Sequence, residues 1–147
     1  MQIVVVAVGK IKEPGLRALI DDYLNRISRY AQVKEIELKD EPADKLTDKI
    51  QKAIPSRARV IAMEVTGVQW SSHKLASYLA QCELQSVNGL AFVIGGAYGL
   101  PAEVSQSADL KLSLSAMTLP HRLARLILVE QIYRGFSITR NEPYAHE

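Results

Sequence analysis

The sequence predicts one α/β domain with a mostly parallel sheet and helices on both faces, and three observations support this. Strand-like apolar runs alternate with helix-like segments along the whole chain. Two of the runs, "QIVVVAV" and "GLAFVIGG", are continuously apolar, as in strands that are buried on both faces of a parallel sheet. Finally, 147 residues suit a single core, so we expect residues 1–147 to form one domain.

The first half of the chain alternates strand, helix, strand and helix. Residues 2–8 are typical of a buried strand that ends at Gly9, and residues 14–30 place apolar side chains at helical spacing. The stretch "VKEIELK", residues 33–39, alternates apolar and charged residues like a half-exposed strand. Residues 43–54 predict a more polar helix that Pro55 ends.

The second half continues the alternation. We expect a strand at "RVIAMEV", residues 59–65, followed by a helix that Ser71 or Ser72 caps and that runs to about Leu84. A buried strand over residues 89–96 leads to a short helix that opens at Pro101. The fifth strand is "LKLSLS", and a long helix follows from about Leu119 to Ile138.

The last helix is apolar on almost every side, so it must be buried on most of its surface. Its own sheet covers one side. The other side needs a partner, and a symmetric homodimer is the commonest way to supply one.

Composition excludes several classes of protein. Cys82 is the only cysteine, which leaves no intramolecular disulfide and no cysteine-based zinc site, and we expect no metal. With no signal peptide and no apolar run near 20 residues, we expect a soluble cytoplasmic protein without a membrane partner. The net charge of +2 and the pI near 8.7 permit an anionic partner without requiring one.

The glycine-rich turn in "FVIGGAYGLPAEV" is not a phosphate-binding loop. No Lys follows its glycines as in a P-loop, and its spacing and late position do not fit a Rossmann fingerprint. Gly95, Gly96 and Gly99 instead permit a flat ligand to approach the main chain closely, or form a tight turn and nothing more. These residues alone leave both interpretations open.

A second loop follows the fifth strand in "LSLSAMTLPHRLAR". If the fourth and fifth strands are neighbours, both loops open on the same edge of the sheet, where α/β folds bind ligands. Residues 116–119 would line that pocket with small apolar groups and exposed main chain. Such a lining suits a purine ring better than a triphosphate.

The motifs quoted above resemble those of the RlmH family, SPOUT-superfamily methyltransferases of bacterial large-subunit ribosomal RNA. The resemblance runs from "MQIVVVAVGKIKEPG" through "AMEVTGVQWSSHKLA" and "FVIGGAYGL" to "TLPH" and "EQIYRGFSI", and so covers nearly the whole chain. The family's tail usually ends Pro-Tyr-His followed by a basic residue. Here "EPYAHE" keeps Tyr144 but has Ala145 and His146 at the next two positions.

This resemblance implies an S-adenosylmethionine-dependent enzyme that methylates N3 of a pseudouridine in 23S ribosomal RNA, on the assembled ribosome. It also implies a C-terminal trefoil knot, which general folding rules argue against, and a homodimer with the active site near the dimer interface. Carried over by motif, the cofactor site would consist of Met63, Gly95, Leu114, Ser115, Ala116, Met117, Thr118 and Leu119.

Methylation at N3 displaces a proton, so the implied reaction needs a group that accepts it or stabilises the anion. The candidates for proton handling or substrate positioning are His121, Arg122, Tyr144 and His146. Arg125 and Arg134 are candidates for contact with RNA phosphate, although either helical arginine could instead be solvated or salt-bridged, and Arg134 could pair with Glu130 four residues earlier. His121 could equally only seat the helix that it opens.

Other conspicuous residues have simpler interpretations. We expect Tyr133 and Phe136 to be core or dimer contacts, His73 and Trp70 to be packing residues, and Cys82 to be inert because no basic neighbour is evident. Two alternatives from other classes stay open. One is an RNA-binding α/β module without catalysis, and the other is a small-molecule enzyme that binds a nucleotide.

Overall fold

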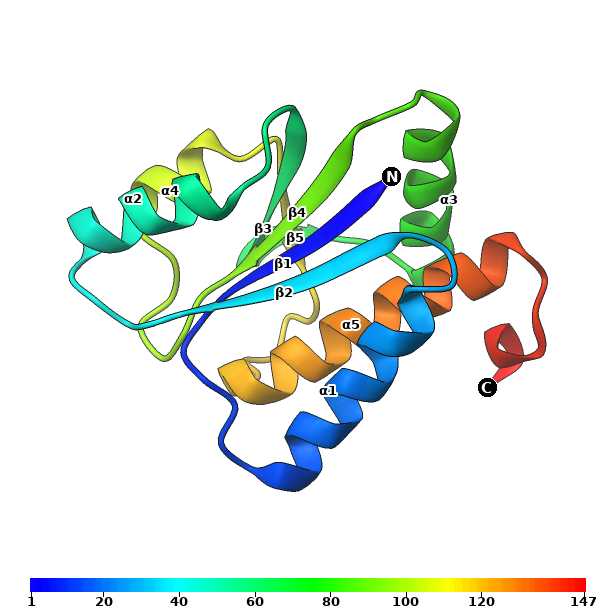
Figure 1. Cartoon of the computed structure of the whole chain (residues 1–147), viewed down its shortest axis with the longest axis horizontal. Coiled ribbons are helices and arrows are strands. Elements are labelled where there is room, and N and C mark those ends of the chain that lie inside the picture. The colour runs from blue at the N-terminus through cyan, green and yellow to red at the C-terminus, as the bar shows by residue number, and fades with distance from the viewer.

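A computed structural model describes residues 1–147 as a five-stranded sheet between two layers of helices (Figure 1). The predicted alternation of five strands and five helices is confirmed. In chain order the elements are β1 (Gln2–Val8), α1 (Pro14–Ile27), β2 (Gln32–Leu38), α2 (Ala43–Ala53), β3 (Ala58–Gln69), α3 (Ser72–Leu84), β4 (Gly89–Ile94), α4 (Ala102–Ser107), β5 (Leu110–Ser113), α5 (His121–Thr139) and the 3₁₀ helix η1 (Pro143–His146).

All strand pairs are parallel, in the order β2-β1-β4-β3-β5. The two continuously apolar strands, β1 and β4, pair with each other at the centre of the sheet, with Val5 opposite Phe92. Their position explains their composition, because a central strand with helices on both faces has no polar side. β2 lies at one edge and is only partly buried, as its alternating pattern predicts.

The helices divide between the two faces of the sheet (Figure 1). α1, α3 and α5 cover the face with the larger apolar core, and α2 and α4 cover the other. α5 packs against both α1 and α3. Gly135 allows the close contact with α3, since a Cβ at this position would lie 2.8 Å from Leu79 Cδ1.

Several predicted bounds need correction. α1 ends at Ile27, three residues early, and α5 begins at His121 rather than Leu119. β3 continues to Gln69, beyond the predicted Val65, because its pairing with β5 shifts register between Met63 and Val68 and then resumes. Gly67 permits this, since a Cβ there would lie 2.6 Å from the main chain of Lys111.

Ser71 is the predicted N-cap of α3, and its hydroxyl accepts a hydrogen bond from the Lys74 amide at 3.1 Å. Among the helices, none is both long enough and apolar enough to cross a membrane.

Candidate functional site

A cavity of about 170 Å³ lies at the carboxyl ends of β3, β4 and β5, the edge at which parallel sheets bind ligands. Its walls come from the end of each strand, the glycine turn, the loop after β5 and the start of α5. The lining residues are Met63, Glu64, Val65, Ile94, Gly95, Gly96, Gly99, Leu100, Leu112, Ser113, Leu114, Ser115, Met117, Leu119, His121 and Ala124.

The two predicted loops meet here, although the strands that carry them are not neighbours. β3 lies between β4 and β5, so the condition that the fourth and fifth strands be adjacent is not met. Because the whole sheet is parallel, both loops still leave the same edge. The intervening strand adds Glu64 and Val65 to the lining beside the predicted Met63.

The glycine turn is held in a tight conformation. Gly96 and Gly99 form an isolated bridge, with the Gly99 amide donating to the Gly96 carbonyl at 3.1 Å. A Cβ on Gly95 would lie 2.5 Å from the Gly99 carbonyl carbon and 2.7 Å from the Leu100 nitrogen. Among the three glycines of this turn, only Gly99 has a positive φ, of 78°. Gly95 is therefore required for close main-chain approach and Gly99 for backbone conformation.

The loop after β5 is shaped by its serines. The Ser113 hydroxyl donates to the Ser115 carbonyl at 3.0 Å, and the Ser115 hydroxyl accepts from the Met117 amide at 2.9 Å. This leaves Met117 at the mouth of the cavity with 78% of its surface exposed. The loop therefore presents an uncovered apolar side chain beside the opening.

Six of the eight residues predicted for the cofactor line the cavity. They are Met63, Gly95, Leu114, Ser115, Met117 and Leu119. Ala116 and Thr118 are exposed and do not line it. The cavity is also lined by residues that no motif indicated, among them Ile94, Leu100 and Ala124. Their position immediately beside the two loops was the available signal.

The lining is mostly apolar side chain and glycine main chain, with few ionisable groups. Glu64 and His121 are the only acidic and basic side chains in it. Apolar walls suit the faces of a flat ring, and free amide and carbonyl groups suit its edges. At about 170 Å³ the cavity is below the roughly 300–1,000 Å³ of drug-sized sites, so in this conformation it encloses only part of a nucleotide-sized ligand.

The predicted RNA contact of Arg125 is wrong for this structure. Arg125 is 1% exposed, because it lies on the face of α5 that packs against the sheet. Its guanidinium pairs with Glu37 and with Glu35, the latter at 3.3 Å, and its Nη2 donates to the Gly9 carbonyl at 3.0 Å. A group buried in this way cannot contact a phosphate on the surface.

Arg17 completes a network with Arg125, Glu35 and Glu37. It pairs with Glu35 at 2.5 Å and with Glu37 at 3.1 Å, so two guanidinium groups balance two carboxylates. Glu37 also accepts a hydrogen bond from the Ile11 amide at 3.0 Å. The network therefore joins α1, β2 and α5 to the loop that follows β1.

The C-terminal tail packs against α1 and α5, a structural role that the sequence did not indicate. The Tyr144 ring lies 4.7 Å from that of Tyr133, and its hydroxyl hydrogen-bonds that of Tyr23 at 2.9 Å. Burial, and then the bond with Tyr23, raise the pKa of the Tyr144 hydroxyl above its ordinary value. Tyr144 therefore stays protonated at neutral pH and is no proton acceptor here. His146 is exposed.

Arg134 holds the tail rather than extending into solvent. Its Nε donates to Glu130 at 2.7 Å, which confirms the expected pairing, and its Nη1 donates to the Glu147 carbonyl at 2.8 Å. The guanidinium also lies 5.0 Å above the Tyr144 ring. An RNA contact by Arg134 stays a prediction, and it would require these interactions to be given up.

The candidate catalytic residues fall into two groups, at opposite ends of α5. His121 lines the cavity, and Arg122 beside it forms an exposed ion pair with Glu13 at 3.5 Å. Tyr144 contacts α5 at Tyr133, twelve residues further on, or about 18 Å along the helix axis. Within one chain the two groups therefore do not meet.

Tyr133 and Phe136 are 4% and 0% exposed, so the expectation that they are core residues is confirmed. Trp70 packs on Tyr78, with ring centroids 5.2 Å apart, but His73 is exposed and does not pack. Cys82 does have a basic neighbour, since Arg59 Nη1 donates to its sulfur at 3.6 Å. The expected lack of a basic neighbour is therefore wrong, but burial raises the pKa of this thiol and so favours its less reactive protonated form.

A larger hollow of about 930 Å³ lies at the opposite edge of the sheet, at the amino ends of β1, β2 and β4. Its lining is mostly polar, including Gln2, Arg29, Ser56 and Asn88. This edge carries no strand carboxyl ends, so we place the functional site at the smaller cavity. The structure brings together no group of three or more His, Cys, Asp or Glu side chains that could hold a metal ion.

Comparison with known proteins gives concordant results at the level of sequence. Residues 1–146 match a family model described as predicted SPOUT methyltransferase. A ribosomal RNA large subunit methyltransferase H from Sorangium cellulosum is 47% identical over 146 residues, which cover 99% of this chain and 100% of the relative. A protein of the same description from Carboxydothermus hydrogenoformans is 44% identical, with 98% and 99% covered.

Solved structures resemble the fold at low sequence identity. A probable methylase family protein from Haemophilus influenzae has a TM-score of 0.58 at 12% identity, covering 95% of this chain and 67% of that one. A putative methylase family protein from Neisseria gonorrhoeae has a TM-score of 0.54 at 11% identity, covering 90% and 80%. At such identities the likeness concerns the fold alone.

Proposed function

The chain belongs to the SPOUT methyltransferase family, among the ribosomal RNA large subunit methyltransferases H, and we propose from this that its substrate is N3 of a pseudouridine in 23S ribosomal RNA. The single observation that carries the proposal is the 47% identity to such a methyltransferase over the full length of both chains. The enzyme would act in the cytoplasm, on the assembled ribosome.

The cavity at the carboxyl edge fits the cofactor of this family, S-adenosylmethionine. Gly95 and Gly96 line the cavity without side chains, so an adenine edge can approach their main chain, and the apolar side chains of Met63 and Leu114 offer packing for its faces. Glu64 adds one negative charge to the lining, which favours a ligand with a cationic sulfonium. The cofactor, when bound, supplies an electrophilic methyl group.

The protein's own share of the reaction is to position the base and to take the N3 proton as the new N–CH₃ bond forms. His121 is the basic side chain in the cavity lining, so we assign the proton transfer to it. Tyr144 stays protonated and can only donate or share a hydrogen bond. Positioning supplies most of the rate, because methyl transfer asks little covalent chemistry of the protein.

A homodimer would bring together the two groups of candidate residues. Tyr144 and His146 lie far along α5 from the cavity of their own chain, so a partner's tail is the one that would reach it. The two segments that line the cavity also carry exposed apolar side chains, with Tyr98 91% and Leu123 40% exposed. Such a patch is characteristic of a protein interface.

The dimer is tested by light scattering coupled to gel filtration. Replacing Leu123 or Tyr98 by Glu should convert the dimer to a monomer, since each change places a charge in the proposed interface. Leu84, 85% exposed at the far end of α3, provides the control, and Leu84→Glu should remain dimeric. A wild-type protein that is monomeric at micromolar concentration would rule out the dimer.

The same family membership leads us to propose a knotted C-terminal part. In its support, the chain reaches β5 at the edge of the sheet and then returns to bury α5 between α1 and α3. Pulling the protein by its two termini tests this. A knotted chain would extend less than an unknotted chain of 147 residues, and full extension would exclude the knot.

The activity is tested by incubating the protein with labelled S-adenosylmethionine and ribosomes that lack the modification. Label should appear at N3 of one pseudouridine in 23S rRNA, and less label is expected with free rRNA. Binding of RNA without cofactor would favour the non-catalytic module instead. Binding of a nucleotide without any effect on ribosomes would favour a small-molecule enzyme.

A further inference from the structure

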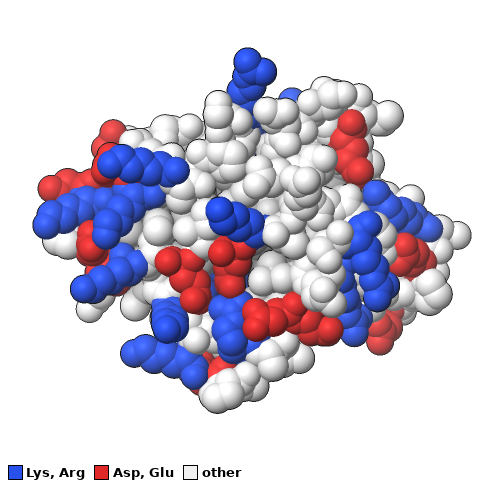
Figure 2. All heavy atoms as spheres, viewed as in Figure 1, with Lys and Arg blue, Asp and Glu red and all other residues white.

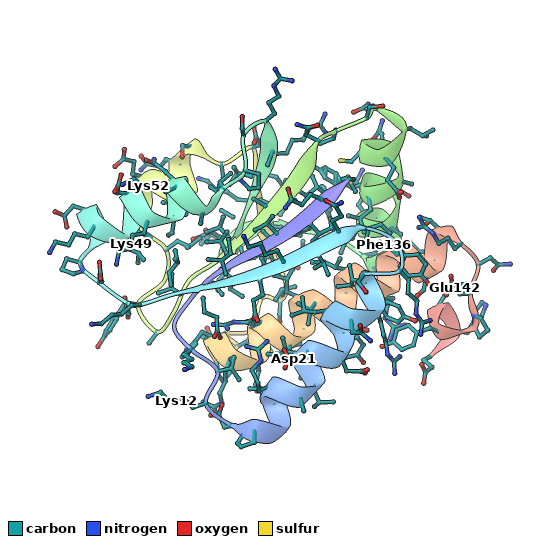
Figure 3. All side chains as sticks on the ribbon, in the orientation of Figure 1. Lys12, Asp21, Lys49, Lys52, Phe136 and Glu142 are labelled. Carbon is teal, nitrogen blue, oxygen red and sulfur yellow. The ribbon has the colours of Figure 1, made fainter.

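The loop between β1 and α1, residues Gly9–Glu13, carries two lysines that no carboxylate neutralises. Lys10 and Lys12 are exposed, and neither lies within 4.0 Å of an acidic side chain. Figure 3 shows Lys12 projecting outward from this loop, away from the body of the molecule. Most cations on this face instead lie among acidic side chains (Figure 2), as on α2, where Lys49 pairs with Glu41 at 2.7 Å and Lys52 with Asp48 at 3.0 Å.

The loop itself is firmly fixed. The Gly9 amide donates to the Leu38 carbonyl at 2.7 Å, and the Gly9 carbonyl accepts from Arg125 at 3.0 Å. The Ile11 side chain is 5% exposed, and its amide donates to Glu37. Because Ile11 faces inward, its two neighbours, Lys10 and Lys12, are directed to solvent. The buried network of Arg17, Glu35, Glu37 and Arg125 thus presents two lysines on a rigid support.

This support lies beside the cavity. The last residue of β1, Val8, has its carbonyl 3.3 Å from where a Cβ on Gly96 would lie, so the loop begins against the glycine turn. At its other end, Glu13 pairs with Arg122, the neighbour of His121 in the cavity lining. Figure 1 shows the same arrangement, with the β1–α1 loop next to the first turn of α5.

We propose that Lys10 and Lys12 bind backbone phosphates of the substrate RNA next to the nucleotide that enters the cavity. This rests on the proposed function. Two uncompensated cations on a fixed loop at the mouth of the site are complementary to a polyanion. The arginines near this loop are already paired with carboxylates. Arg17 and Arg125 balance Glu35 and Glu37, and Arg122 pairs with Glu13.

The test compares Lys10→Gln/Lys12→Gln with Lys49→Gln/Lys52→Gln, which removes two paired lysines from α2. For Lys10→Gln/Lys12→Gln, the KM for unmodified ribosomes should rise by about 10-fold. The negative slope of log affinity against log salt should become less steep by about 1.5–2. The kcat and the Kd for S-adenosylmethionine should stay at wild-type values. The control pair should match the wild type, and Lys10→Arg/Lys12→Arg should restore the KM.

Ribosome affinity is also measured directly by cosedimentation, so the phosphate contact is judged even if no methyl is transferred. An inactive wild type would overturn the proposed function, whereas equal affinity and salt slope in the two glutamine pairs would overturn this inference. A weakened Kd for S-adenosylmethionine in Lys10→Gln/Lys12→Gln would also overturn it, because the lysines would then contact the cofactor.

Discussion

The two ends of helix α5 differ in how many of their side chains are buried or paired with other side chains. At the first turn, His121 opens onto a cavity, Leu123 is 40% exposed, and Arg122 forms only an exposed ion pair with Glu13. At the last turns, Tyr133 is buried against Tyr144, and Arg134 has partners on both sides. The first end is therefore available to ligands, and the second end is occupied with holding the tail.

This difference separates two consequences of mutation. Changes near the first turn should alter ligand binding more than stability, and changes near the last turns should do the reverse in a single chain. Arg125 is the exception, because it lies at the first end but is buried in a charge network.

The largest expected effect is therefore on stability, from Arg125→Ala. Removing one partner of a buried ion network leaves uncompensated charge, which costs about 3 kcal/mol in the free energy of unfolding. Urea denaturation followed by circular dichroism measures it. Arg122→Ala provides the matched control three residues away, where loss of an exposed pair should cost less than about 1 kcal/mol. Equal losses in the two variants would contradict the structural role of Arg125.

Gly95→Val should weaken S-adenosylmethionine binding at the open end. The added side chain meets the main chain of Gly99 and Leu100, so the turn that forms this wall of the cavity must shift. Because the ligand then meets a displaced wall, we expect its Kd to rise by at least about 10-fold. Titration calorimetry measures the Kd, and circular dichroism should still show a folded protein. Gly15→Ala is the control, because a Cβ there meets nothing within 4 Å. Unchanged binding in Gly95→Val would make this glycine dispensable to the pocket.

Tyr144→Phe tests the last turns of α5, where the C-terminal tail is held. It keeps the ring on Tyr133 but loses the hydroxyl bond to Tyr23, which should lower the free energy of unfolding by about 1 kcal/mol. The Kd for S-adenosylmethionine should not change. Tyr98→Phe, at a tyrosine that is 91% exposed, should leave the stability as it is. If Tyr144→Phe were as stable as this control, the tail would not be held as the structure indicates.

The smallest effect concerns pH. Burial, and then the hydrogen bond to Glu142, raise the pKa of Tyr30 to about 12. A raised pKa means that the stabilisation is complete below the unfolded value near 10 and is lost as the pH rises through 12. The stability difference between wild type and Tyr30→Phe should therefore be constant from pH 7 to about 9 and shrink between about pH 10 and 12. A difference that shrinks below pH 9 instead would show another group to be responsible.

The sequence predicted the fold well because its strands differ in composition for physical reasons. The continuous apolar runs of β1 and β4 indicate strands inside the sheet, and the alternating pattern of β2 indicates a strand at its edge. It could not predict the resumed pairing of β3 at Val68, which depends on Gly67 approaching Lys111 in space. The order of β3 and β5 was likewise invisible, since strand pairing is not local.

The candidate site was predicted in part. Met63, Gly95 and Leu114 line the cavity, whereas Glu64, the one acid in its wall, escaped notice because a single Glu in a strand gives no signal of its own. Arg125 resembled a surface cation because its partners, Glu35 and Glu37, lie some 90 residues earlier in the chain. The structural role of the C-terminal tail could not be predicted for the same reason, since Tyr23, which Tyr144 contacts, is 121 residues away in the sequence.

The buried charge network also restricts how this sequence can evolve. Arg17 and Arg125 together balance Glu35 and Glu37, so a mutation that replaces Arg125 alone passes through a destabilised intermediate. A lineage could instead first lose one carboxylate, because Arg125 would keep the other as its partner and the partly exposed Arg17 would be solvated, and only then lose the arginine. The three positions should therefore change together among relatives, and the order of their substitutions along a phylogeny should follow this sequence of events.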